Sequence, residues 1–511
     1  MADSMNENAC PLCAVENLSF EAPNCSLCGV QFKQNVKYFT ALEGDAKYFF
    51  CTACYNKTEG ESITVGGLHI YKARLKKTKS NEENLESWVQ CDKCNCWQHQ
   101  ICALFNSKRN EEEKAEYICP KCYVQEIEIG QRMPLQESAI LGAKDLRRTR
   151  LSDFIEGRLF RRLKQEREER AKSMGRNFNE VPGVEDLVLR VVLSSDKKLQ
   201  VKQNFLDVFK EENYPKEFPY RSKVILLFQK IEGVEVCLFG MYVQEFGSEC
   251  AHPNQRSIYI SYLDSVKFFR PDIRTATGEA LRTFVYHEIL VGYLDYCKKR
   301  GFSRCFIWSC PPSKADDYIF YCHPEIQKTL KPEYLREWYH AMLRKAANEK
   351  IVVNVTTIYE HFFVPHGECK VTATRLPYFD GDYFSRAAED MLKNLVEEDG
   401  VKPRRKQKKP KSRRSLECTD FSGTSVTDIL LMQELGKSIC KTKENFIMVN
   451  LESEHMALDT EDKDEIIESK IFDSRETLLR FCETNHYQFD TLRRAKYSSM
   501  MLLYHLHNPS A

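Results

Sequence analysis

The 511-residue sequence lacks long hydrophobic runs and any marked excess of one charge. No apolar stretch approaches the length of a membrane-spanning helix, and the run 224–228 is typical of those present. The first residues contain no basic region followed by an apolar core, so they give no indication of a secretory signal. Lysines and arginines number 75 against 74 aspartates and glutamates, which excludes a globally basic nucleic-acid binder but not a local basic patch.

Cysteine is scarce over most of the chain and concentrated at one end. Twelve of the 22 cysteines lie within the first 122 residues. Without an indication of secretion, a disulfide framework fits this pattern poorly, and metal-bound thiolates in a reducing compartment fit it better. With 42% hydrophobic residues the chain can bury a sizeable core, and its length suggests about three domains.

Five cysteine pairs have the spacing Cys-x-x-Cys, and a sixth pair has the spacing His-x-x-Cys. Two ligands in one tight turn can share an ion, and two such turns complete a tetrahedral zinc site. Such sites replace the core that a small module cannot build. The pattern predicts about three structural zinc ions, with the ligands Cys10, Cys13, Cys25, Cys28, Cys51, Cys54, Cys91, Cys94, His99, Cys102, Cys119 and Cys122. We expect the remaining Cys96 to be a structural or free thiol.

The last eight ligands follow the order of a plant homeodomain (PHD) finger, in which alternate pairs share an ion. This resemblance predicts one zinc on Cys51, Cys54, His99 and Cys102, and a second on Cys91, Cys94, Cys119 and Cys122. The first four cysteines would hold a third ion. The resulting prediction is a RING-like segment at residues 1–50 and a PHD-type finger at 51–125. Trp97 is a candidate peptide contact, although packing inside the finger is the more ordinary role for such a residue.

The rest of the chain alternates strand-like and helix-like patterns. Leu159 and Leu163 predict a helix with a hydrated face inside a polar linker at 126–180. Apolar runs predict strands at 224–228, 234–242, 257–263, 304–309 and 445–451. Helical spacing predicts helices at 281–296, 335–346 and within 475–507. Mixed strands and helices indicate an α/β core.

A very basic segment follows this core. Nine of the thirteen residues from Lys402 to Arg414 are basic, which is typical of a disordered stretch. Two interpretations of this segment are open: it is a nuclear import signal, or it is a solvated linker.

Several longer motifs occur in one order along the core: Tyr259–Pro271, Leu281–Leu290, Ile307–Pro312, Asp317–Pro324 and Arg336–Tyr339. Together they resemble the CREB-binding-protein family of histone acetyltransferases. The similarity covers about 135–395 and returns at 490–495, while Trp88–Cys94 resembles the plant-type, HAC-like branch. The resemblance implies an acetyltransferase domain at 135–511 with an α+β core, in which helices surround a central sheet, and a basic disordered loop at 400–425.

The resemblance also implies the chemistry and its residues. Acetyl would pass from acetyl-CoA to histone lysines without an acetyl-enzyme, with Tyr339 as general acid and Trp308 in the lysine tunnel. A neutral phenol, with a reference pKa of about 10, can protonate the departing CoA sulfur. The implied cofactor contacts are Leu263, Asp264, Ser265, Arg282, Thr283 and Trp338, and the implied substrate contacts are Ser222, Asp380 and Asp473. From spacing alone, Trp338 and Tyr339 would be core residues.

Some positions depart from the family pattern. Tyr334 stands where animal relatives have a cofactor-contacting arginine, and Lys470 where an acidic residue is expected. Ser309 replaces a usual alanine, and Phe384 replaces an aromatic that is usually tryptophan. The basic segment 402–414 occupies the place of the family's autoinhibitory loop. The sequence shows no bromodomain pattern and no ZZ-type or TAZ-type finger, so we expect either a member that lacks those modules or an incomplete gene model.

We expect non-catalytic roles for the other reactive side chains. We expect Cys310 to be a structural thiol, because nothing in the sequence brings His287 or His323 near it. We expect Glu288 and the pair Asp316/Asp317 to lie on a solvated face or in a helix cap.

The leading hypothesis is a nuclear histone acetyltransferase and transcriptional coactivator that uses acetyl-CoA and zinc. Its partners would be histones and chromatin, with transcription factors as a further class, and without membrane or sequence-specific DNA binding. The alternative is a chromatin-reading zinc-finger protein with a weak or inactive core, which Tyr334 and Lys470 favour. A RING-type ubiquitin ligase is a third hypothesis, disfavoured because the family's RING-like and finger unit explains all the zinc ligands.

Overall fold

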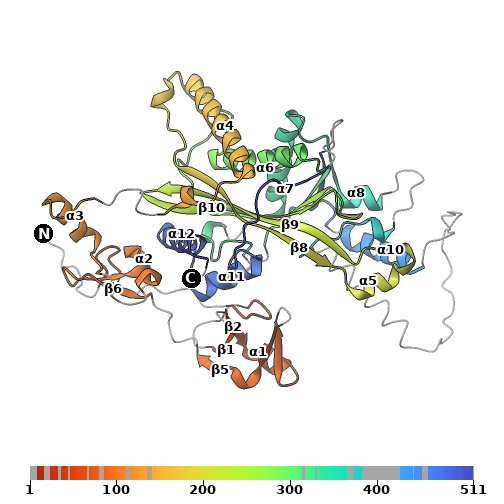
Figure 1. Ribbon diagram of the computed structural model, residues 1–511, viewed down its shortest axis with the longest axis horizontal. Helices are drawn as coiled ribbons and strands as arrows, with labels where there is room; N and C mark the ends of the chain where they lie inside the picture. Colours follow the sequence, from red (N-terminus) through yellow and green to blue (C-terminus); the bar gives the residue numbers. More distant parts are fainter. Residues whose placement is uncertain are drawn as a thin grey trace.

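A seven-stranded sheet forms the centre of the structure (Figure 1). Its order is β13-β14-β12-β11-β10-β9-β8, and β11 and β12 are its one parallel pair. The strands are β8 (Leu187–Gln200), β9 (Glu217–Ile231), β10 (Val234–Phe246), β11 (Ser257–Ser265), β12 (Arg304–Trp308), β13 (Asn354–Thr357) and β14 (Phe446–Asn450). The computed structural model describes residues 9–15, 24–30, 32, 36–43, 46–65, 68–79, 86–110, 116–134, 141–312, 317–327, 331–364, 372–381, 426–440, 442–451 and 459–509.

The central strands are apolar because both of their faces are covered. In β9 every residue from Ser222 to Gln229 is buried, which explains a continuous apolar run in place of alternation. The five predicted strands are confirmed, with differences at their ends. The sequence analysis missed two strands of this sheet: β8, in which an apolar half is followed by a polar half that alternates between half-buried and exposed positions, and the four-residue β13.

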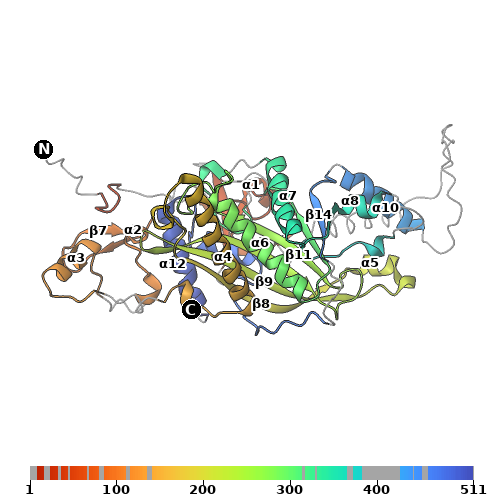
Figure 2. The ribbon, with the colours of Figure 1, turned by 90° about the horizontal axis from the view of Figure 1, so that it is seen from above.

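Helices cover both faces of the sheet. On one face lie α4 (Arg150–Met174), α6 (Leu281–Lys299) and α7 (Pro332–Asn348), as Figure 2 shows from above. On the other face lie α11 (Arg475–Thr484) and α12 (Leu492–His507) (Figure 1). The predicted helices are confirmed, the last being divided in two by residues 485–491. Thr149 and Ser152 form a capping box at the start of α4, and Gly175 ends it with φ of 62°.

Smaller elements lie at the two ends of the sheet and below its middle in the view of Figure 1. At one end α5 (Gln203–Val208), α8 (Ile358–Phe363) and α10 (Val426–Cys440) surround a second hydrophobic cluster rich in aromatic rings. None of the helices within the described stretches combines the length and the apolar composition that crossing a membrane requires.

The cysteine-rich segment contributes only short elements. They are β1 (Lys37–Glu43), β2 (Ala46–Cys51), β3 (Ser62–Val65), β4 (Leu68–Tyr71), β5 (Lys76–Lys79), β6 (Trp88–Gln90), β7 (Trp97–His99), α1 (Thr52–Lys57), α2 (Gln100–Ala103) and α3 (Pro120–Glu128). This segment contacts the core through the C-terminal helices, with α2 against α12 and β2 against α11. The C-terminal helices therefore join the sheet to both parts of the cysteine-rich segment.

Helix α4 is part of the core, and it carries buried charge. Arg158 lies between Glu288 of α6, at 2.8 Å, and Glu349, at 2.7 Å. The expectation that Glu288 lies on a solvated face is wrong, because its side chain is fully buried in this ion pair. The predicted hydrated face of α4 is correct only in part, since Glu166 and Arg170 are also buried and paired.

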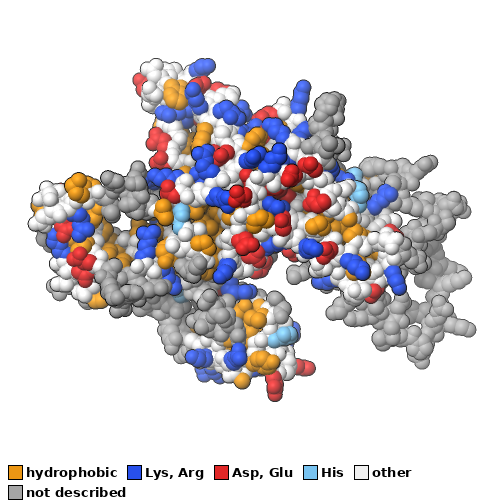
Figure 3. Space-filling view, viewed as in Figure 1, with side chains coloured by type: hydrophobic (Ala, Val, Ile, Leu, Met, Phe, Trp, Pro, Cys, Tyr) orange, Lys and Arg blue, Asp and Glu red, His pale blue; other side chains and the backbone are white. Residues whose placement is uncertain are grey.

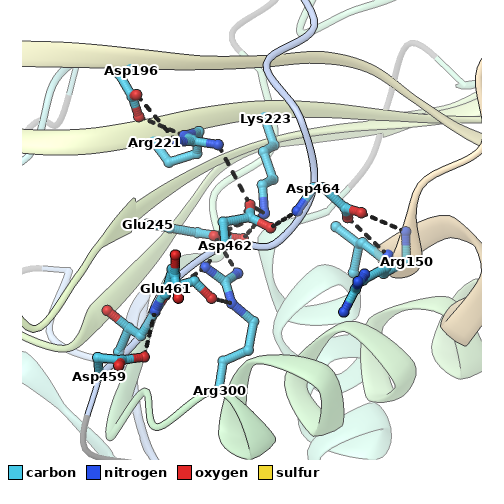
Figure 4. Close-up of polar contacts among 12 residues, drawn as sticks. Arg150, Asp196, Arg221, Lys223, Glu245, Arg300, Asp459, Glu461, Asp462 and Asp464 are labelled. Atoms are coloured by element: carbon cyan, nitrogen blue, oxygen red, sulfur yellow. Dashed lines mark hydrogen bonds and ion pairs between the residues drawn. The ribbon is translucent and has the colours of Figure 1, made fainter.

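A second buried ion cluster ties a distant segment to the sheet (Figure 4). Lys223 of β9 pairs with Glu245 of β10 at 2.9 Å and with Asp462 at 2.5 Å. Arg300, just after α6, pairs with Glu245 at 2.7 Å. Although burial acts in the opposite direction, Lys223 and Arg300 lower the pKa of Glu245. Asp464 then caps α4 by accepting from the backbone of Arg150.

We predict that Lys223→Met destabilises the fold by about 3 kcal/mol, because Glu245 and Asp462 would remain buried with fewer cations. Thermal unfolding of the whole chain measures the loss. Lys437→Met is the matched control, because Lys437 forms an exposed pair with Glu434, and its unfolding midpoint should hardly move. Equal midpoints for the two variants would contradict this account of the cluster.

Candidate active site and metal centres

The parallel strands β11 and β12 separate at their carboxyl ends. They pair from Ser257 with Arg304 to Ile260 with Ile307, and β11 then continues to Ser265 without β12 beside it. A β-bulge in the β10–β11 ladder, at Ser261, accompanies this separation, and bulges bend the strand that carries them. Ligands of sheets with parallel strands bind outside such carboxyl ends.

The proposed cofactor residues lie at this separation. Leu263, Asp264 and Ser265 are the half-buried last residues of β11. Arg282 and Thr283 are half-buried in the first turn of α6, where helix N–H groups lack intrahelical partners and favour anions. This combination of a guanidinium, a hydroxyl and a helix start can accommodate the phosphates of a nucleotide.

The carboxylate of Asp264 is engaged with the protein. One oxygen accepts hydrogen bonds from the backbone N–H groups of Ile319, at 2.8 Å, and Phe320, at 3.0 Å. The other accepts from the backbone of Ser265, at 2.8 Å, and lies 2.7 Å from His323 Nε2. Asp264 therefore holds residues 319–323 against β11, a role that the sequence analysis did not foresee.

Tyr339 lies within electrostatic range of Asp264 at this strand end. Its side chain, on α7, is 3% exposed. This burial agrees with the core position that the helical spacing alone predicts. Burial, with smaller contributions from Cys305 and Asp264, raises the pKa of Tyr339 above its usual value. The phenol consequently keeps its proton at neutral pH.

Trp338 connects α7 to α6. Its ring meets His287 edge-on at 4.5 Å and Tyr339 at 5.1 Å. His287 is buried and lies 3.3 Å from Glu279, and burial lowers the pKa of this histidine despite that carboxylate. Lys345 of α7 also pairs with Glu279, at 2.7 Å. Helix α7 is thus fixed on both sides of its crossing with α6.

Trp308 ends β12 and is partly buried against the aromatic cluster. Its ring is 5.5 Å from that of Phe446, its partner in the β12–β14 register. The neighbouring Ser309 is buried and donates both its N–H and its hydroxyl to the carbonyl of Asn445. The serine that replaces the usual alanine therefore has a satisfied hydroxyl.

The three proposed substrate residues lie near β9. Ser222 is buried within that strand. Asp380 is exposed and accepts a hydrogen bond from Tyr220 at 2.9 Å. Burial, then Asp380 and more weakly Asp473, raise the pKa of Tyr220 above its usual value. Both carboxylates therefore act on one tyrosine, and Asp473 pairs with Lys197 at 2.8 Å.

The remaining departures lie at the surface or outside the described residues. Tyr334 is 69% exposed at the start of α7, and Lys470 is exposed. Cys310 is partly buried, and burial raises the pKa of its thiol, which agrees with an unreactive role. Phe384, Asp316 and the basic segment 402–414 lie outside the described residues.

Three groups of four ligands come together in the cysteine-rich segment. They are Cys10, Cys13, His99 and Cys102; Cys25, Cys28, Cys51 and Cys54; and Cys91, Cys94, Cys119 and Cys122. In each group the ligand atoms lie within 4.8 Å of one another. Tetrahedral zinc with 2.3 Å bonds places two sulfurs about 3.8 Å apart. The sulfurs of Cys28 and Cys51, and of Cys94 and Cys119, are 3.8 Å apart, so the donor sets fit zinc.

This arrangement corrects the predicted pairing. Only the third group was predicted correctly. His99 and Cys102 meet Cys10 and Cys13 instead of Cys51 and Cys54, which join Cys25 and Cys28. The predicted domain boundary between residues 50 and 51 would separate Cys25 and Cys28 from Cys51 and Cys54, which belong to one group. The reason is that β1 and β2 form one hairpin, which carries Cys51 back to the Cys25 turn and leaves the finger to be completed from the N-terminal pair.

Trp97 is 53% exposed on β7, opposite Gln90 of β6. The expectation that it packs inside the finger is therefore wrong. Trp88 has that role instead, since its half-buried ring packs at a tilt against His99 with centroids 4.0 Å apart.

Comparison with known proteins finds one matching family for the core and another for the cysteine-rich segment. The histone acetyltransferase domain KAT3 matches residues 176–446, and the PHD-finger family matches residues 77–122. "Probable histone acetyltransferase HAC-like 1" of Oryza sativa subsp. japonica is 54% identical, over 100% of this chain and 35% of that protein. "Histone acetyltransferase HAC12" of Arabidopsis thaliana is 55% identical, over 100% and 34%. "Protein cbp-1" of Caenorhabditis elegans is 33% identical, over 90% and 23%. The chain spans about a third of the length of these plant relatives.

The zinc pairing can be tested with double variants, because each cluster should lose its ion once its tetrahedron is broken. Cys13 and His99 share a cluster, so we expect Cys13→Ser with His99→Ala to remove one ion. Cys51 belongs to another cluster, so Cys51→Ser with His99→Ala should remove two. Native mass spectrometry of the whole chain counts the ions, with Cys96→Ser as the control that keeps them all. Loss of a single ion in the Cys51/His99 variant would contradict the structure.

Proposed function

This chain belongs to the KAT3 histone acetyltransferase family, and from that premise we propose that its core transfers acetyl from acetyl-CoA to lysine side chains of histones. The observation that carries the proposal is the buried phenol of Tyr339, whose pKa is raised in part by Asp264 at the open end of β11 and β12. Acetyl-CoA would lie across that end, with its phosphates toward Arg282 and Thr283 at the start of α6. Its thioester would then be close to the side chain that can protonate the leaving sulfur.

Each residue would have a distinct part in the transfer. The lysine amine, in its neutral form, attacks the thioester carbonyl, and the carbon–sulfur bond breaks as Tyr339 donates its proton to sulfur. The nitrogen then releases one proton as the amide forms, and that proton restores the phenol of Tyr339. The flat ring of Trp308 would line the path of the lysine stem. Direct transfer of this kind needs no acetyl-enzyme, which agrees with the reading of Cys310 as a structural thiol.

Histone tails are basic, so carboxylates near the site would attract them. We assign that role to Asp380, which accepts a hydrogen bond from Tyr220, and to Asp473, which also affects the pKa of this tyrosine. On the face shown in Figure 3, acidic and basic side chains are interspersed and neither sign dominates, so the attraction would be local. The roles of nuclear coactivator and partner of transcription factors follow from the same family membership as proposals.

The cysteine-rich segment would hold three zinc ions, one in each group of four ligands. A second function is favoured by Trp97, whose exposed ring on a two-stranded sheet suits contact with an extended peptide. We therefore propose that the PHD-type finger binds histone tails and brings chromatin to the enzyme core.

The transferase is tested by following labelled acetyl from acetyl-CoA to core histones at pH 7–8. Tyr339→Phe should lower kcat at least about tenfold, because the variant removes the acid and little of the packing. Tyr497→Phe is the matched control, since it removes the hydroxyl of another buried tyrosine, on α12. Zinc-loaded wild-type protein that transfers no acetyl would contradict the proposal, and full activity in Tyr339→Phe would contradict the role of Tyr339.

The proposed binding of histone tails by the PHD-type finger is tested with a different variant. Trp97→Ala should weaken binding of the whole chain to histone-tail peptides at least about tenfold, because an exposed aromatic contact is removed. Acetylation of free histones should be unaffected. Phe160→Ala removes an exposed aromatic of α4 and serves as the control. Peptide binding that is equal in all three proteins, measured by fluorescence anisotropy, would show that Trp97 is not the contact.

A further inference from the structure

Residues 317–327, here called the latch loop, lie along the end of β11 that carries the proposed cofactor contacts. Ile319 and Phe320 donate their backbone N–H groups to Asp264. Farther along, the side chain of Gln327 donates to the carbonyl of Ser265, at 2.9 Å, and accepts from the N–H of Lys267, at 2.9 Å. The loop is therefore attached to the strand at two separate points.

His323 supplies the central attachment. Its Nε2 lies 2.7 Å from Asp264 Oδ1, and its Nδ1 lies 2.7 Å from Asp317 Oδ1. Because carboxylates only accept hydrogen bonds, both ring nitrogens must carry a proton, and the ring is an imidazolium. A neutral ring would leave one lone pair facing a carboxylate. The residue is 9% exposed, so this charge is shielded from water.

The protein environment supports the charged form. Burial disfavours the imidazolium, but Asp264 and then Asp317 outweigh it and raise the pKa of His323 to about 10. The ring contacts Asp264 of β11 and Asp317 of the loop. The groups that interact with those two residues are Arg475 and Cys482 of α11, Tyr286 of α6 and Tyr339 of α7. The two carboxylates are the groups that contact the ring itself.

The backbone of the latch loop is held in an uncommon shape. Cys322 has φ of 58°, a left-handed conformation that β-carbon-bearing residues rarely adopt. Its N–H donates to Asp317 Oδ2 at 2.8 Å, so the carboxylate that pairs with His323 also holds this turn. Beside it, Ile319 packs where Gly240, the β10 partner of Asp264, has no side chain, since a Cβ there would lie 3.4 Å from Ile319.

We propose that His323 is a positioning residue for acetyl-CoA, which bridges Asp264 and Asp317, fixes the latch loop against β11 and so presets Leu263, Asp264 and Ser265 for the cofactor. The inference rests on the proposed function, because it takes acetyl-CoA to bind at this strand end. In this proposal the Asp264 carboxylate holds the loop, because it already contacts four protein groups.

The first test separates cofactor binding from chemistry. His323→Gln keeps one hydrogen-bond donor but loses the charge and the second contact. We expect KM for acetyl-CoA to rise at least about tenfold while kcat stays within about threefold, because Tyr339 and Trp308 remain in place. His505→Gln is the matched control, since His505 is 8% exposed in α12, and its KM for acetyl-CoA should be that of the wild type.

The second test uses pH and leaves the imidazole in place. With two carboxylates the imidazolium persists at neutral pH, so the wild-type KM for acetyl-CoA should show no histidine titration between about pH 6 and 9. Asp317→Asn removes one carboxylate and lowers the pKa of His323 toward its ordinary value. A group with a raised pKa stabilises the bridge below that pKa and loses the effect as pH rises through it. KM of Asp317→Asn should therefore rise with pH within this range.

The outcomes are distinguishable. Titration calorimetry of CoA alone shows whether the site exists, and a folded wild type that binds no CoA would overturn both the proposed function and this inference. A wild type that binds CoA, with His323→Gln binding it equally well, overturns the inference alone. If His323→Gln does not fold, Asp317→Asn decides, since a KM that is independent of pH in that variant also overturns it.

Discussion

Strands β11 and β12 run side by side for four residue pairs and then part, and the candidate site is built around that separation. A bulge at Ser261 lies at the point where β11 loses its pairing with β12, and β12 stops at Trp308. The gap lies at the carboxyl ends of the parallel pair, which is where such sheets bind ligands. Helix α7 carries the buried phenol of Tyr339, which lies within electrostatic range of Asp264 at this strand end. The separation thus determines where the cofactor, the lysine and the acid would meet.

Buried charge keeps this arrangement in place. Lys223, Glu245 and Asp462 join the sheet to a segment more than two hundred residues away in sequence. Arg158 and Glu288 join α4 to α6. At the site itself, Asp264 and His323 join the strand to the latch loop. Such clusters cost free energy to bury, so they stabilise a structure only when every partner is present. They specify how distant segments meet more than they add to overall stability.

The sequence predicted the local structure well where one physical signal dominated. Continuous apolar runs identified β9 and β10, and helical spacing identified α6 and α7. The exposed half of β8 gave no such signal and was missed. The twelve metal ligands were identified from their spacing, but spacing cannot show which turns a hairpin brings together, and two of the three groups were paired wrongly. The bridge from Asp264 through His323 to Asp317 was missed because Asp264 and His323 are 59 residues apart in sequence.

The central claim is that the cofactor and the lysine meet at the carboxyl ends of β11 and β12. The most direct measurement is a crystal structure of this chain with a bisubstrate conjugate, in which the CoA sulfur is linked to the side-chain nitrogen of a lysine peptide. The account predicts that the CoA crosses the carboxyl ends of β11 and β12, with phosphates at the start of α6 and the sulfur within hydrogen-bonding distance of the Tyr339 hydroxyl. A conjugate bound elsewhere, or a sulfur out of reach of Tyr339, would contradict it.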